Sequence, residues 1–212
     1  MKKKVTVLFV LFITSLFTGF CYAQQVDTEL DKRVKDFLDS YRQKWVDWNV
    51  TYDEGLVLYN IIIQNGYTKA LEIGTSTGHS SIWIAWALSK TGGQLITLEI
   101  DPARREKALK NFAQAGLSDY IDAQLGDAHQ LVKQLPGPFD FVFSDADKVW
   151  YKQYFIDLYP KLEVGGCFTA HNVRNPYGGI KEFLDFVQAH PKMDTTIDTT
   201  SRSGISISYK RE

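Results

Sequence analysis

Hydrophobic and polar residues follow two different periods along this chain. Between Asp27 and Trp48 the apolar residues recur every three or four positions with polar residues between them, which predicts an amphipathic helix. A second helix is expected from Leu56 to Gln64, opened by residues 53–55 and ended by residues 65–66. The N-terminal part of the fold is therefore predicted to be a helical segment over residues 27–65.

From residue 70 onward, short apolar runs typical of buried strands alternate with helical patterns. The expected strands are Ala70–Ile73, Gln94–Ile100, Ile121–Leu125, Phe139–Ser144 and Cys167–Ala170, with two more near Thr195–Thr199 and Ile205–Tyr209. The expected helices are Ile82–Leu88, Pro102–Gln114, Ala128–Gln134, Val149–Tyr159 and Gly179–Ala189. Strict alternation of this kind predicts an α/β fold, with helices on both faces of a mostly parallel sheet. We expect residues 24–212 to form a single domain.

The first 23 residues have the pattern of a secretory signal peptide. Three lysines at positions 2–4 precede an apolar run over residues 5–20, and small residues in Cys21-Tyr22-Ala23 suit cleavage after Ala23. The same run, left uncleaved, is near the lower length limit for a membrane anchor. If the segment is cleaved, the protein is expected to be exported to the periplasm or the medium. If it is not, the rest of the protein is expected to be tethered to the membrane outside the cytoplasm. This segment is the only expected contact with a membrane.

Composition excludes some partners and leaves others open. The 212 residues carry a formal net charge of −1, so no bulk electrostatic attraction to nucleic acid is expected. The sequence has two cysteines, and loss of Cys21 with the signal peptide would leave Cys167 without an intramolecular partner. Cys167 lies in an apolar run and is interpreted as a small buried hydrophobe. Homodimerisation stays open.

The first expected strand is followed by a turn with two glycines. The pattern Glu72-x-Gly74-x-x-x-Gly78 lets the backbone bend tightly and lets a ligand approach the main chain. The helix that begins just beyond offers free N–H groups to an anionic group. This spacing differs from the dinucleotide pattern G-x-G-x-x-G, and an ordinary strand-to-helix turn is the alternative interpretation.

Acidic residues follow the next two strands. Glu99 ends the second strand, where an acid placed some 20 or more positions after a glycine turn accepts hydrogen bonds from ribose hydroxyls. Asp127, in Gly126-Asp127-Ala128, either helps to hold an adenine edge or only caps the next helix. Both acids are predicted at the edge of the sheet where ligands bind.

A second group of chemically active residues follows the fourth and fifth strands. Asp145, Asp147 and Lys148 come after one strand, and His171 and Asn172 come after the next. Carboxylate, imidazole and amide together can coordinate a divalent cation, beside which Lys148 could act as a general base. A salt-bridged loop is the alternative interpretation of the same residues.

The motifs together resemble the class I O-methyltransferases of the catechol and caffeoyl-CoA type. The resemblance rests on Leu71–Ser80, Glu99, Gly126-Asp127, Ser144–Lys148 and the stretch from Gly165 to Asn172, with Asn49-Val50 and residues 53–55 in front of them. It implies a Rossmann-like fold with a seven-stranded, mostly parallel sheet, S-adenosylmethionine (SAM) as the methyl donor, and transfer to a hydroxyl of a small, usually phenolic acceptor.

The resemblance also implies roles for individual residues. Those matching the cofactor-binding positions of the family are Val50, Glu72, Gly74, Thr75, Ser76, Gly78, Ser80, Glu99, Ile100, Asp127, Ala128 and Asp145. Among them Glu99 falls on the ribose and Asp127 with Ala128 near the adenine. Lys148 matches the catalytic lysine, and Asp145 and Asn172 match metal ligands.

His171 departs from the family pattern, which usually has aspartate at that position. A neutral imidazole removes a negative charge, so the site should shift from magnesium toward manganese, iron or zinc, or lose the metal. Without metal, His171 could itself deprotonate the hydroxyl. The short interval between Asn172 and the last strand favours a small acceptor over a CoA ester.

Two competing functions stay open at this point. A nicotinamide-dependent dehydrogenase would share the fold, although its glycine pattern and a Tyr-x-x-x-Lys pair are not convincing here. An exported, non-catalytic module that binds SAM, its product S-adenosylhomocysteine (SAH) or a nucleotide would fit both the signal peptide and a degenerate metal site.

Overall fold

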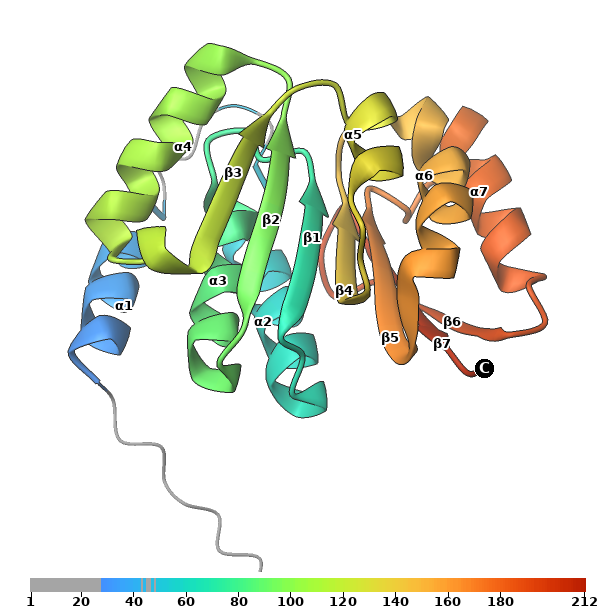
Figure 1. Cartoon of the computed structure of the whole chain (residues 1–212), viewed down its shortest axis with the longest axis horizontal. Coiled ribbons are helices and arrows are strands. Elements are labelled where there is room, and N and C mark those ends of the chain that lie inside the picture. Colours follow the sequence, from blue (N-terminus) through green and yellow to red (C-terminus); the bar gives the residue numbers. More distant parts are fainter. Residues whose placement is uncertain (1–27, 43, 45–46, 48) are drawn as a thin grey trace, which may run out of the picture.

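Seven strands form one sheet in the order β3-β2-β1-β4-β5-β7-β6 (Figure 1). The computed structural model describes residues 28–42, 44, 47 and 49–212, so the expected signal peptide lies outside the described residues. The strands are β1 Lys69–Ile73, β2 Gln94–Glu99, β3 Ile121–Leu125, β4 Phe139–Ser144, β5 Leu162–His171, β6 Met193–Asp198 and β7 Ile205–Lys210. Strands β1 to β5 run parallel, and β7 is antiparallel to both of its neighbours. The predicted α/β fold class is confirmed.

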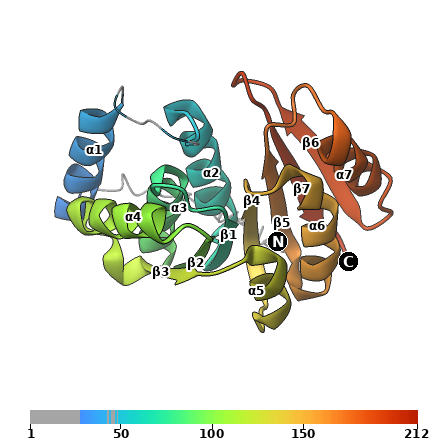
Figure 2. The ribbon, with the colours of Figure 1, turned by 90° about the horizontal axis from the view of Figure 1, so that it is seen from above.

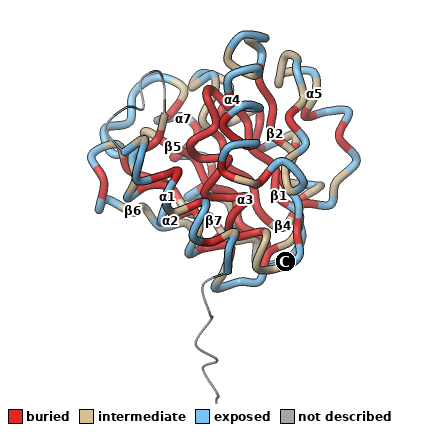
Figure 3. The backbone as a smooth tube through the Cα atoms, turned by 90° about the vertical axis from the view of Figure 1, so that its left-hand side faces the viewer, coloured by how far each residue is buried: buried red, intermediate tan, exposed pale blue. Residues whose placement is uncertain are grey.

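Helices cover both faces of this sheet (Figure 2). They are α1 Glu29–Tyr41, α2 Tyr52–Asn65, α3 His79–Thr91, α4 Pro102–Ala115, α5 Ala128–Gln134, α6 Tyr151–Leu158 and α7 Gly178–Gln188, with short 3-10 turns at Ser118–Tyr120, Lys148–Trp150 and Tyr159–Lys161. Leu71 of β1 belongs to the core shared with α6 and α7, whereas its neighbour Ala70 packs with α2 and α3. Successive residues of the strand thus serve opposite faces, and the buried interior in Figure 3 lies between the two helical layers.

Helix α1 adds a further layer over α3 and α4. Val34 and Leu38 are buried against Phe112 of α4, while Asp31 accepts a hydrogen bond of 2.7 Å from Trp86 Nε1. The helix ends at Tyr41, whereas the sequence pattern predicted that it would continue to Trp48. That extension is wrong, because Arg42 and Lys44 lie in turns and Asp47 has a φ of 74°, which no right-handed helix allows.

Other predicted boundaries also shift. Helix α2 begins at Tyr52 and not at Leu56, because Thr51 and Glu54 form a capping box. Strand β5 begins at Leu162, five residues before the predicted start at Cys167, and continues to His171. This extension brings His171 into register with Ile205 of β7, inside the sheet. Among the described residues, no helix is both long and apolar enough to cross a membrane.

Candidate active site

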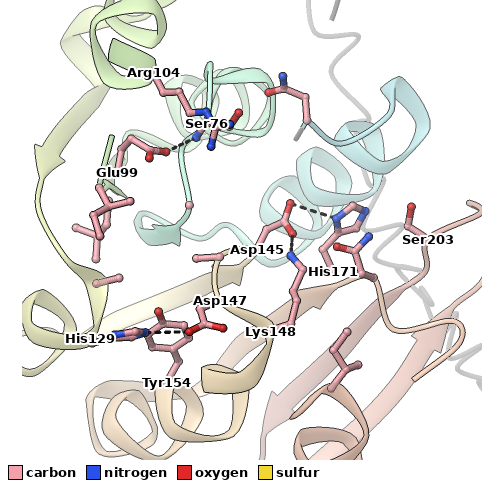
Figure 4. A pocket seen from close by; sticks show the side chains of 18 of the residues that line it. Ser76, Glu99, Arg104, His129, Asp145, Asp147, Lys148, Tyr154, His171 and Ser203 are labelled. Atoms are coloured by element: carbon pink, nitrogen blue, oxygen red, sulfur yellow. Dashed lines mark hydrogen bonds and ion pairs between the residues drawn. The ribbon is translucent and has the colours of Figure 1, made fainter. Parts of the chain in front are cut away.

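A cavity of about 900 Å³ opens at the carboxyl ends of the parallel strands. It lies where the strand order reverses between β1 and β4, which is the usual ligand position in open α/β sheets. Figure 4 shows Ser76 and Glu99 in one part of its wall, with Lys148, His171 and Ser203 in another and Asp145 between them. The residues predicted from the ends of β1, β2, β4 and β5 therefore come together around one space.

The turn after β1 approaches this space with its backbone. Gly74 has a φ of 101°, and a Cβ at this position would lie 2.8 Å from the carbonyl oxygen of Asp145, so only glycine fits. The Ser76 amide donates a hydrogen bond of 2.7 Å to Glu99 Oε2. Ser76 Oγ is buried and has no hydrogen-bond partner within the described part of the chain. The turn thus presents a polar atom that a ligand in the cavity can satisfy.

Glu99 joins the β1 and β2 sides of the cavity. Its Oε1 accepts a hydrogen bond of 2.9 Å from the Asp101 amide, which fixes the carboxylate in place. Glu99 is 6% exposed and lines the cavity together with Ile100 and Arg104. Each carboxylate oxygen keeps a lone pair for a second donor, as a ribose diol would require. The contact with a ribose stays a prediction.

Five of the predicted cofactor residues do not line the cavity: Val50, Glu72, Thr75, Gly78 and Ser80. They are buried behind the turn and support it. Thr97 Oγ1 donates a hydrogen bond of 2.6 Å to Glu72 Oε2 and lies 2.6 Å from Thr75 Oγ1, and the carbonyl of Val50 lies 2.7 Å from His79 Nδ1. Burial raises the pKa of Glu72 to about 7 against the hydrogen bonds from Ser80, Ser81 and Thr97 that lower it.

The wall near the expected adenine contains a histidine that the sequence analysis missed. Asp127 caps α5 by accepting a hydrogen bond of 2.9 Å from the His129 amide, and Asp127 and Ala128 both line the cavity. The His129 ring stacks on Trp150 with centroids 3.9 Å apart, and its nitrogens lie 3.3 Å from Asp127 Oδ1 and 3.4 Å from Asp147 Oδ2. The two acids around His129 hold a flat ring in this wall.

The ends of β4 and β5 carry a chain of alternating charges. Lys148 Nζ contacts Asp145 Oδ1, and His171 Nδ1 lies 3.2 Å from Asp145 Oδ2. On its other side, His171 Nε2 lies 3.0 Å from Oε1 of Glu54, a residue of α2. The ring is not well aligned for a hydrogen bond to Glu54, so this second contact is an ion pair. Glu54 was not among the residues predicted for the site.

His171 and Glu54 each shift the pKa of the other. Burial disfavours the charged form of His171, but the hydrogen bond to Asp145 and the contact with Glu54 outweigh it and raise the pKa of His171 to about 9. Burial also opposes ionisation of Glu54, yet the His171 contact lowers the pKa of Glu54 to about 2. Near neutral pH these two residues form an imidazolium–carboxylate pair.

The metal ligand set expected from the resemblance does not fit this arrangement. Both nitrogens of His171 face carboxylates, which only accept hydrogen bonds, so the ring keeps no lone pair for a metal or for a substrate proton. Asp145 has one oxygen on Lys148 and the other on His171. Asn172 lines the cavity and, within the part of the chain that the structure describes, is the candidate ligand without a charged partner. No cluster of three or more His, Cys, Asp or Glu in the described ranges could hold a metal ion.

The remaining wall is rich in basic and amide side chains. Arg174, Asn175, Arg202 and Ser203 line it together with the apolar faces of Tyr177 and Ile180. Arg174 donates a hydrogen bond of 3.0 Å to the Ser201 carbonyl, which ties two loops together. Both arginines are exposed, and within the described ranges neither forms an ion pair with a carboxylate. This wall therefore carries two positive charges that face solvent.

The fold and the cavity define a class of protein. A mostly parallel sheet with the antiparallel strand β7 next to its β6 edge, a glycine turn after β1 and an acid at the end of β2 is the Rossmann-like fold of the class I methyltransferases, as the match to a solved methyltransferase also shows. The family model described as O-methyltransferase matches residues 24–184. This chain belongs to the O-methyltransferase family, and the resemblance predicted from the motifs is confirmed.

Individual relatives support the same family. A catechol O-methyltransferase of Niastella koreensis is 48% identical over 107 residues, which cover 49% of this chain and 48% of that protein. A catechol O-methyltransferase of Mycobacterium tuberculosis is 35% identical over 149 residues, covering 64% of this chain and 67% of that protein. The chain thus matches about half the length of the first relative and two thirds of the second.

Among solved structures, the O-methyltransferase from Bacillus cereus in complex with SAH is similar throughout. Its TM-score is 0.74 at 27% sequence identity, and the match covers 85% of this chain and 91% of that one.

Proposed function

We propose that this protein is a SAM-dependent enzyme that methylates a hydroxyl of a small phenolic acceptor related to catechol. The main observation in support is that one cavity has the turn after β1 and Glu99 at one end and Asp145 and Lys148 at the other. We call these the cofactor end and the acceptor end. A methyl donor bound at the cofactor end would face Lys148, which can take part in proton transfer at the acceptor end. The SAH-bound relative and the names of the two catechol O-methyltransferases support this proposal.

The reaction is an in-line displacement at the sulfonium methyl group. The acceptor oxygen forms a bond to the methyl carbon while the carbon–sulfur bond breaks, and its electron pair returns to sulfur to give the thioether SAH. Lys148, which Asp145 positions as an ammonium at rest, first releases a proton to solvent and then takes the hydroxyl proton as an amine. Most of the acceleration comes from holding oxygen, methyl carbon and sulfur in line.

The positive wall indicates which phenols bind best. Arg174 and Arg202 line the acceptor end, where no carboxylate within the described residues pairs with either. An acceptor with a carboxylate substituent, such as 3,4-dihydroxybenzoate, would neutralise this charge, and the planar ring would pack on Tyr177 and Ile180. We propose carboxylated catechols as preferred acceptors over catechol itself.

Turnover of a phenol panel tests the proposal. The purified protein is incubated with SAM and catechol, 3,4-dihydroxybenzoate or a monophenol, and the methyl ether and SAH are quantified by mass spectrometry. Equal amounts of ether and SAH are expected, with the highest kcat/KM for the carboxylated catechol. Micromolar binding of SAH in calorimetry without turnover of any acceptor would contradict the enzyme.

That failure would favour the second candidate, an exported module that binds SAM or SAH without catalysis. The observation behind it is the predicted signal peptide over residues 1–23, since SAM is made in the cytosol. We propose export with cleavage after Ala23, which the intact mass of protein recovered outside the cytoplasm measures. Full-length protein in the cytosolic fraction would contradict export and leave the enzyme proposal standing.

A further inference from the structure

We propose that Glu54 and His171 replace a divalent cation at the acceptor end, so that the site positions Asp145 and Lys148 without metal. This inference rests on the proposed methyltransferase function for its kinetic consequence but not for its metal-binding consequence. In this arrangement Glu54 and His171 are positioning residues, because they act through Asp145.

Four side chains of the site contact one another in series. Glu54 fixes the outer edge of the His171 ring, His171 holds Asp145 Oδ2, and Asp145 Oδ1 holds the Lys148 ammonium at the cavity. The charges alternate along this series, so each carboxylate lies between or against cations. Figure 4 shows the last three of these side chains converging from β5 and from the segment after β4. The His171 ring, held between two carboxylates, thereby occupies the place beside Asp145 Oδ2 that a metal ion would need.

Glu54 is held independently of its partner. Its Oε2 accepts a hydrogen bond of 2.7 Å from the Thr51 amide as the third residue of the α2 capping box, which leaves Oε1 directed at His171. Glu54 is 1% exposed and His171 is 5% exposed, so neither charge can be stabilised by bulk water. A buried charge without a partner is strongly unfavourable, which ties the two residues together.

A hard cation would meet an unfavourable set of groups here. Magnesium and calcium require several oxygen ligands, yet both oxygens of Asp145 already contact cations. A metal next to Asn172 would also have to displace the Lys148 or His171 side chain to reach an oxygen of Asp145. The donors therefore fit a fixed organic cation and do not fit a divalent ion.

Metal binding of the wild-type protein is the first test. Metal content after dialysis is measured by mass spectrometry, and the melting temperature is measured during titration with Mg²⁺, Mn²⁺ and Zn²⁺. We expect no stoichiometric metal and no rise in melting temperature, and turnover that a chelator leaves unchanged. Bound metal at one equivalent, or turnover lost to the chelator and restored by Mg²⁺ or Mn²⁺, would overturn the inference.

Two variants sharpen this result. His171→Asp removes the cation and adds an oxygen ligand, so Mg²⁺ at about 100 times its Kd should raise the melting temperature by roughly 5 °C or more. Glu54→Gln keeps the shape but frees the ring, and should lower kcat about tenfold or more at an unchanged KM for SAM, with no rescue by metal. Metal rescue of Glu54→Gln, or an unchanged kcat, contradicts the positioning role. Glu106→Gln, which removes an exposed carboxylate on α4, is the matched control.

Absence of turnover on every acceptor, with or without metal, would count against the enzyme proposal alone. The metal content and melting measurements still decide whether the pair replaces an ion.

Discussion

The cofactor end and the acceptor end of the cavity are built in different ways. At the cofactor end the backbone of the β1 turn forms the wall. The Glu99 carboxylate ties this turn to β2 by accepting a hydrogen bond of 2.7 Å from the Ser76 amide, and it accepts another of 2.9 Å from the Asp101 amide. At the acceptor end, charged side chains from α2, β5 and the segment after β4 hold one another in ion pairs. The first end depends on local chain geometry, and the second depends on contacts between distant parts of the sequence.

This difference predicts where substitutions will be tolerated. A backbone wall survives most side-chain changes except at positions such as Gly74, where a Cβ would strike Asp145. A chain of buried charges loses its balance when any one member is removed. Variation between relatives of this fold should therefore accumulate as coordinated exchanges at the acceptor end.

The largest effect is expected at Lys148. Lys148→Ala should lower kcat by about 100- to 10,000-fold, the range for loss of a general base, while the Kd for SAH stays unchanged. Lys148→Arg keeps the charge but cannot accept a proton, so it should be equally slow. Steady-state kinetics and calorimetry measure both. Lys152→Ala on α6 is the control, and wild-type turnover in Lys148→Arg would mean that charge alone matters.

Glu99 tests the opposite end. Glu99→Ala should raise the Kd for SAH about 100-fold, the equivalent of two lost hydrogen bonds to a charged acceptor, with kcat at saturating SAM much less affected. Asp101→Ala removes the neighbouring acid, which caps α4, and should change the melting temperature more than the Kd. Unchanged SAH affinity in Glu99→Ala would remove the ribose assignment.

Behind the cofactor end, Glu72 is a fully buried carboxylate whose ionisation is unfavourable. Its pKa is about 7 in the folded protein and 4.5 in the reference state, so the folded state binds the extra proton. Stability should therefore fall as the pH rises from about 4.5 to 7 and stay level above that, a total of about 3 kcal/mol. Glu72→Gln should remove this fall, which denaturant unfolding of both proteins at pH 4.5 and 8 measures. Parallel pH profiles of the two proteins would contradict the shift.

Arg202 gives the smallest and most selective effect. Arg202→Gln should raise the KM for 3,4-dihydroxybenzoate about two- to fivefold, as expected for loss of one exposed ion pair, and leave the KM for SAM unchanged. Catechol, which lacks the carboxylate, should serve as the internal control. An equal increase for both acceptors would show that the arginine shapes the wall without recognising the carboxylate.

Much of the fold was predictable because its signals are local. The alternation of apolar runs predicted each strand, and residues 72–78 with Glu99 marked the cofactor end within one strand–helix–strand unit. The ends of α1 and β5 were not predictable in this way. Asp47 leaves the helical region although no proline or glycine lies there to indicate it. Strand β5 begins at Leu162, and residues 163–166, which resemble a turn in the sequence, form an irregular stretch before the strand pairs again at Cys167.

Glu54 shows why one member of the acceptor end was not predicted. The sequence pattern Thr51-x-x-Glu54 is a capping signal, and it explains one oxygen of this carboxylate. The other oxygen meets His171 only after α2 and β5 are packed, across 117 positions of sequence that no periodicity connects. The sequence shows that His171 departs from the family pattern, but the charge state of His171 depends on its contact with Glu54.

The pairing of Ile205 with His171 has a consequence for the order in which the sheet is completed. Strand β7 follows β6 in the sequence, yet it inserts between β5 and β6 and completes the sheet beside the histidine. Until residues 205–210 are in place, β5 lacks one neighbour, and the surroundings of His171 are incomplete. We therefore expect the turn after β1 and Glu99 to reach their final arrangement before the surroundings of His171 do.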